Sequence, residues 1–203
     1  MNPLRHALDP ALLAALSTAI GDANGSPARV DAVSGIGGGS ISRALLVESG
    51  GNRYFVKVND VTLTAMFAAE ADGLSALAAC PALRVPRVVG HGASDRHAFL
   101  VLEHLPLQTL RERAHGIAAG HALAALHRIR GSHFGWRRDN FIGSTPQHNA
   151  EHRAWPFFFA RRRLLPQLEL ARRDAQHKRL VADGERLAET LARDSGRSRR
   201  SRG

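Results

Sequence analysis

The segment 53–59, Arg-Tyr-Phe-Val-Lys-Val-Asn, constrains the fold of this chain more than any other stretch. Its β-branched and aromatic residues predict a strand, and Lys57 stands in the middle of it. An ammonium group that leaves water without an anionic partner costs free energy, so the Lys57 amine must meet an anion or reach solvent. The segment therefore predicts a strand with an anion close to Lys57.

Two neighbouring segments offer such anions. Segment 35–40 reads Gly-Ile-Gly-Gly-Gly-Ser, and a loop of this kind can bring backbone N–H groups close to phosphate. A helical pattern over 62–79 carries Glu70, whose separation from Lys57 suits an ion pair between sheet and helix. Glycine loop, strand lysine and helix glutamate, in this order, predict the nucleotide-holding half of a protein-kinase-like fold. Taken alone, the glycine string also fits a flexible turn and Glu70 a solvated carboxylate.

The remaining patterns predict an antiparallel sheet followed by helices. Asp9-Pro10 is a helix start signal, Gly50-Gly51-Asn52 is a hairpin signal, and Pro166 is expected to bend or restart its helix. Because hairpins join successive strands, a Rossmann unit is excluded. The expected strands are 29–34, 41–48, 53–59, 84–90 and 97–102, and the expected helices are 10–20, 62–79, 109–128, 155–170 and 176–193.

The charge and cysteine content limit the partners and the compartment. The net charge is +10, which suits nucleic acid, a membrane surface or a phosphate-bearing ligand, but segment 193–203 alone holds five arginines against one aspartate. The single cysteine, Cys80, excludes an internal disulfide and fits a reducing compartment. No apolar run approaches the ~20 residues of a membrane span, and residues 1–6 lack a signal-peptide pattern. We expect a soluble cytoplasmic protein without a membrane partner.

The irregular segments 134–136, Phe-Gly-Trp, and 139–147, Asp-Asn-Phe-Ile-Gly-Ser-Thr-Pro-Gln, resemble the signature of the fructosamine kinase (ketosamine 3-kinase) family. The resemblance covers about residues 5–192, with departures at Ser42, where the family usually has Asn, and at Ala68, where an acidic residue is common. It also takes in segments 38–41, 55–59, 66–74, 84–86, 99–103, 123–127 and 162–168.

This resemblance implies an α+β, protein-kinase-like fold of the aminoglycoside phosphotransferase type, with an antiparallel five-stranded sheet plus helix and an incomplete, mostly helical second lobe. It implies transfer of phosphate from ATP, with Mg²⁺, to a sugar hydroxyl of a small-molecule or protein-bound ketoamine formed by glycation. Lys57 would hold the α- and β-phosphates and Glu70 would orient Lys57. The other implied nucleotide contacts are Gly38, Gly39 and Ser40 over the phosphates, and Glu103 and Leu105 along the adenine hinge.

The resemblance also implies residues that the sequence lacks. The family takes its catalytic Asp from a His-Gly-Asp-Leu-Trp string, and an Asn follows a few residues later; no such string occurs here. In Arg138-Asp139-Asn140 the acid and the amide are adjacent, so they cannot take the two separate roles. We therefore identify no catalytic residue and no metal ligand, and expect little or no turnover from this polypeptide alone. The sequence is expected to leave the family pattern after about Leu191, where the Arg/Ser/Gly composition suggests an altered reading frame.

The expected domains are a nucleotide-binding lobe over 1–104, a partial helical lobe over 105–192 and a disordered tail over 193–203. Helix 109–128 is expected to bury one stripe, formed by Leu110, Ile117, His121, Leu123, Ala124 and Leu126. If the catalytic segment is absent, apolar surface should instead be exposed around Leu110, Leu126, Phe157 and Leu165.

Three functions stay open. The first is a kinase cut short, and the second is a nucleotide-binding fragment without chemistry. The third is a basic nucleic-acid binder that uses segments 161–163 and 172–173 and the arginine tail. No nucleic-acid-binding motif is present, so the third is the least favoured.

Overall fold

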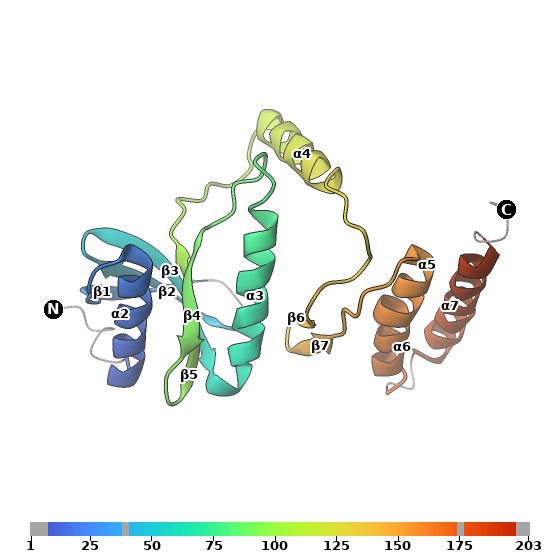
Figure 1. The fold of residues 1–203 in the computed structure, drawn as a ribbon, viewed down its shortest axis with the longest axis horizontal. Coiled ribbons are helices and arrows are strands. Elements are labelled where there is room, and N and C mark those ends of the chain that lie inside the picture. The colour runs from blue at the N-terminus through green and yellow to red at the C-terminus, as the bar shows by residue number, and fades with distance from the viewer. Residues whose placement is uncertain (1–7, 38–40, 174–176, 198–203) are drawn as a thin grey trace. The chain divides into compact units, whose positions relative to one another are not determined.

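The computed structural model describes residues 8–37, 41–173 and 177–197. The chain forms two compact units, Met1–Ile129 and Arg130–Gly203, and each is described by itself (Figure 1). None of the helices in the described part of the chain has the length and apolar character that a membrane span requires. The expected domain boundary after residue 104 stays a prediction.

The first unit opens with helix α2 (Pro10–Asn24), and the sequence explains both of its ends. Asp9 is the N-cap, and its Oδ1 accepts a hydrogen bond of 3.0 Å from the Ala11 N–H, while Pro10 occupies the first helical position. Gly25 ends the helix in the left-handed conformation, with φ of 67°. The predicted start is therefore confirmed, and the helix runs one turn beyond the predicted end at Ile20.

A five-stranded sheet follows, in the order β1-β2-β3-β5-β4, with every neighbouring pair antiparallel. Its strands are β1 (Ala32–Ile36), β2 (Arg43–Ser49), β3 (Asn52–Asp60), β4 (Val88–Ala93) and β5 (His97–Glu103). Gly50 and Gly51 join β2 to β3 with φ of 55° and 77°, the combination that a type I′ hairpin turn requires. The predicted antiparallel five-stranded sheet is confirmed.

The two faces of the sheet are covered by two different helices (Figure 1). Strand β3 alternates, so Val56 and Val58 pack in the core that contains the buried Leu12, Leu16 and Ile20 of α2. The opposite face packs against α3 (Thr64–Leu77), which follows the 3-10 turn η1 (Val61–Leu63); its core includes Phe67 and Leu100. Lys57 alternates with Val56 and Val58, so the pleat places it on the α3 face.

Helix α4 (Arg113–His127) corrects one expectation: it has no buried residue. Leu110 lies before the helix and is 65% exposed, and Ile117 and Leu123 are 47% and 50% exposed. His121 and Ala124 are also exposed, and Leu126 is half-buried. The predicted buried stripe is therefore wrong, because an amphipathic pattern shows that a helix has an apolar face but not which element covers it.

The second unit contains the short hairpin β6 (Asn140–Ile142) and β7 (Thr145–Gln147), followed by helices. Helix α5 (Trp155–Phe159) passes through one π-helical stretch, η2 (Ala160–Leu164), into α6 (Leu165–Ala171). Pro166 lies in the first turn of α6, directly after the π-helical stretch, so the regular α-helical pattern is interrupted next to the proline that was expected to bend or restart the helix. Phe157 and Leu165 are half-buried.

Helix α7 (Lys178–Arg197) packs against α5, η2 and α6. Gly184 lies close to α6: a Cβ at this position would lie 2.6 Å from Leu168 Cδ2, so a larger residue would require the Leu168 side chain to shift. The helix continues to Arg197, and residues 198–203 of the expected disordered tail lie outside the described residues.

Candidate functional site

Lys57 and Glu70 form the ion pair that the sequence predicts. Lys57 Nζ lies 2.7 Å from Glu70 Oε1 and 2.9 Å from Oε2, so the ammonium contacts both carboxylate oxygens. Strand β3 supplies the lysine and helix α3 supplies the glutamate. Glu70 is the anionic partner that a lysine in an apolar strand requires, so the predicted ion pair between Lys57 and Glu70 is confirmed.

The pair is not closed to solvent, because both side chains are 31% exposed. An ammonium has three N–H donors, and the two Glu70 oxygens lie to one side of it, so donor capacity remains for a further anion. On the sheet, Lys57 lies between Ala44 of β2 and the buried Leu100 of β5, which fix its position. The arrangement can therefore hold an external oxyanion at a defined place beside Glu70.

Gly38, Gly39 and Ser40 lie outside the described residues, so their expected role over the phosphates stays a prediction. The residues that follow them are tied to the lysine strand: Asn59 Nδ2 donates to the Ile41 carbonyl at 2.8 Å and to Ser42 Oγ at 3.1 Å. Asn59 shares a face of β3 with Lys57, two residues away. Sequence reasoning did not assign Asn59 a role, although its period-two spacing from Lys57 places the two on one face.

Glu103 ends β5, and its carboxylate is already occupied. One oxygen forms an ion pair with Arg84, and the other accepts the Arg87 backbone N–H at 3.1 Å. The Arg87 hydrogen bond, together with the Arg84 guanidinium, lowers the pKa of Glu103 below its ordinary value. Both carboxylate oxygens of Glu103 are therefore engaged in contacts within the first unit. Leu105, the second expected hinge residue, is half-buried just beyond the strand.

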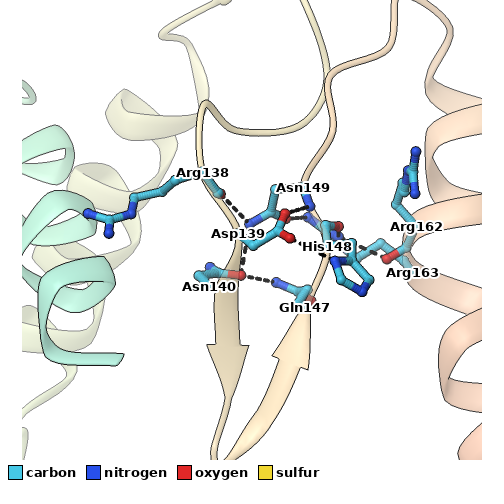
Figure 2. A network of polar contacts seen from close by, with 8 residues as sticks. All are labelled: Arg138, Asp139, Asn140, Gln147, His148, Asn149, Arg162 and Arg163. Atoms are coloured by element: carbon cyan, nitrogen blue, oxygen red, sulfur yellow. Dashed lines mark hydrogen bonds and ion pairs between the residues drawn. The ribbon is translucent and has the colours of Figure 1, made fainter. Parts of the chain in front are cut away.

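A second polar cluster lies within the second unit and is centred on Asn149, which is 1% exposed (Figure 2). Its Nδ2 donates to the Arg138 carbonyl at 3.1 Å and to Asn140 Oδ1 at 2.8 Å. Its Oδ1 accepts a hydrogen bond from Arg163, whose other nitrogen reaches the His148 carbonyl at 3.0 Å. The hydrogen-bonded centre of this unit thus lies two residues after the signature segment 139–147 and contacts Asn140 within it.

Asp139 belongs to this cluster. Its Oδ1 accepts the Asn149 backbone N–H at 2.7 Å, and its Oδ2 lies 2.7 Å from His148 Nδ1 (Figure 2). The Asn149 hydrogen bond, followed by that of His148, lowers the pKa of Asp139 below its ordinary value. Both carboxylate oxygens therefore stabilise the loop that follows β7.

The described residues also contain no group of three or more His, Cys, Asp or Glu side chains that could hold a metal ion. The expectation that this chain supplies no catalytic base and no metal ligand stays a prediction.

The lowered pKa of Asp139 predicts an acid-sensitive second unit. A carboxylate whose folded pKa is depressed contributes stability above its unfolded pKa, 3.8, and loses that contribution as pH falls through the folded value. We expect the urea midpoint of the wild type to fall below pH about 4, and that of Asp139→Asn to fall less. Trp136 and Trp155 are the only tryptophans, so their fluorescence reports this unit alone. Parallel pH profiles for the two proteins would contradict this role of Asp139.

The fold and the Lys57–Glu70 pair together define the class of protein. A five-stranded antiparallel sheet with a β3 lysine paired to a glutamate of the following helix is the N-terminal lobe of a protein-kinase-like fold. The family model of fructosamine kinase matches residues 12–199. The chain belongs to the fructosamine kinase family. The match begins and ends later than the expected range 5–192, so the sequence stays within the family pattern beyond Leu191.

The relatives agree with this assignment. The chain is 42% identical over 167 residues to a probable ketoamine kinase of Synechocystis sp. The alignment covers 82% of this chain and 56% of that protein. It is 35% identical over 164 residues to a probable ketoamine kinase of Klebsiella aerogenes, covering 80% of this chain and 57% of that protein. The chain thus spans little more than half the length of these curated relatives.

Two crystal structures resemble the fold. One, from Haemophilus somnus and assigned as a fructosamine-3-kinase, superposes with a TM-score of 0.76 at 27% identity, covering 87% of this chain and 60% of that one. The other, from Thermobifida fusca and assigned in the same way, has a TM-score of 0.71 at 29% identity, covering 88% and 61%.

Proposed function

We propose that the first unit binds ATP, with the Lys57 ammonium on the α- and β-phosphates and Glu70 holding Lys57 in place. The observation that carries the proposal is the half-exposed ion pair, with Nζ 2.7 Å from Glu70 Oε1 and donor capacity left over. Gly38, Gly39 and Ser40 would cover the phosphates, and the main chain at Glu103 and Leu105 would meet adenine. Family membership supports this assignment.

The reaction we propose for the family fold is phosphoryl transfer from ATP to a sugar hydroxyl of a ketoamine, free or protein-bound, as a step in protein deglycation in the cytoplasm. The names of the relatives support the substrate class. In such reactions Mg²⁺ neutralises charge on the phosphates.

A second candidate is nucleotide binding without turnover by this chain alone. It is favoured by one observation: the His-Gly-Asp-Leu-Trp string from which the family takes its catalytic Asp does not occur in the sequence. Two of the arginines expected to serve nucleic-acid binding make contacts within the second unit, which weakens that alternative. Arg163 lies over the Phe158 ring at 4.6 Å and Arg172 pairs with Glu169 and Glu185, so these side chains serve internal contacts.

The proposal predicts that ATP stabilises the purified chain. Binding to the folded state alone raises the free energy of unfolding by about 2.7 kcal/mol at a ligand concentration of 100 times Kd. We expect ATP and ADP to raise the melting temperature. Sodium chloride of equal ionic strength, without nucleotide, should not raise it. A melting temperature that ATP leaves unchanged up to millimolar concentrations would contradict ATP binding. Incubation with a fructosyl-amine, ATP and Mg²⁺ then separates the two candidates, because only a kinase gives the phosphorylated sugar.

A further inference from the structure

At the end of β5, the main chain and the side chain of Glu103 both bind segment 84–87, through two hydrogen bonds and one ion pair. The Glu103 N–H donates to the Arg87 carbonyl at 2.9 Å, and the Arg87 N–H donates to Glu103 Oε2 at 3.1 Å. The remaining oxygen, Oε1, pairs with Arg84 Nη2. Three contacts therefore converge on one residue where the strand stops.

Arg84 is itself held in place. Its Nη1 donates to the neighbouring Val85 carbonyl at 3.2 Å while Nη2 faces Glu103. One guanidinium thus bridges its own backbone segment and the β5 carboxylate. Without it, Oε1 would lose its charged partner, and the orientation of the Glu103 side chain would depend on the single Arg87 N–H.

Glu103 is the last strand residue before an extended connection, since α4 begins only at Arg113. The direction in which the main chain leaves the sheet is therefore set at Glu103, by the three contacts above. The Glu103 carboxylate and the Glu103 N–H are both engaged, so we place a ligand edge against the main chain that continues through residue 105, and the position of that main chain depends on these contacts.

We propose that Arg84 is a positioning residue for adenine: its guanidinium fixes Glu103 and thereby orients the backbone at 103–105 toward the base. This inference rests on the proposed function, because it assumes that nucleotide binds beside Lys57. It assigns no contact between Arg84 and the ligand.

The test compares two ligands by calorimetry, ADP and inorganic tripolyphosphate, because only ADP carries a base. Arg84→Ala should weaken ADP binding by about two- to fivefold, the range that a partly exposed ion pair supports, and leave tripolyphosphate binding unchanged. Lys57→Ala should weaken both ligands. Arg84→Lys should recover part of the ADP affinity, because it keeps the charge. The double variant Arg84→Ala/Glu103→Ala should lose no more ADP affinity than Glu103→Ala alone, because each substitution removes the same ion pair.

Arg96→Ala is the matched control, because Arg96 is exposed and precedes β5 at its opposite end; it should bind both ligands as the wild type does. Unchanged ADP affinity in Arg84→Ala would overturn the inference, and so would an equal loss of tripolyphosphate, which would indicate a general structural defect. A wild type that binds neither ligand would overturn the proposed function itself.

Discussion

Lys57→Ala is expected to lose nucleotide binding while the chain stays folded. The substitution removes the ammonium that we place on the phosphates, and hydrogen bonds to charged groups contribute about 1.5–3 kcal/mol each, so affinity should fall at least about tenfold. Glu70→Gln should give a smaller loss, because the amine remains and only its partner, 2.7 Å away, loses its charge. Both effects are measured as the ATP-dependent rise in melting temperature and by calorimetry with ADP.

Lys178 provides the matched control for this substitution. It is the only other lysine of the chain, it is exposed, and it lies on α7 in the second unit. Lys178→Ala should keep the wild-type response to ATP. An unchanged ATP response in Lys57→Ala would remove Lys57 from the nucleotide site.

Asn149→Leu should destabilise the second unit by about 2–4 kcal/mol. Leucine keeps nearly the same volume but removes three side-chain hydrogen bonds, those to Arg138, Asn140 and Arg163. Asn140 and Arg163 then stay half-buried without the Asn149 amide, and an unsatisfied buried polar group costs more than a typical hydrogen bond contributes. Urea unfolding followed by tryptophan fluorescence measures the effect, because both tryptophans belong to this unit.

Ser144→Leu is the control for introducing a leucine in the same unit. Ser144 is exposed in the turn between β6 and β7, so its replacement should change the free energy of unfolding by less than about 0.5 kcal/mol. If Asn149→Leu changes the free energy of unfolding, measured by tryptophan fluorescence, by less than about 0.5 kcal/mol, the Asn149 cluster does not stabilise the second unit.

Local chemistry made several features of the fold predictable. Asp9 and Pro10 fix a helix start through groups one or two residues away, and Gly50 and Gly51 fix a hairpin through their own φ values. The pairing of Lys57 with Glu70 was also predictable, because an apolar strand with one lysine needs an anion and the following helix offers one.

Features that depend on distant partners were not predictable. Asn149 lies in a polar stretch that looks exposed, and its burial depends on Arg163 from a helix 14 residues later. The Glu103 carboxylate was expected along the hinge, but its partner Arg84 lies 19 residues earlier and no local pattern links them. The close approach of Leu168 to Gly184 is likewise not visible in the local sequence.

The most direct test of the central claim is the chemical labelling of Lys57 from the nucleotide site. An acyl-phosphate derivative of ATP transfers its acyl group to a nearby lysine amine, which forms an amide and releases ATP. Because the chain has two lysines, mass mapping compares Lys57 directly with Lys178. We predict rapid acylation of Lys57 that excess ATP suppresses, with slow, ATP-independent acylation of Lys178. Equal labelling of the two lysines, insensitive to ATP, would contradict the account.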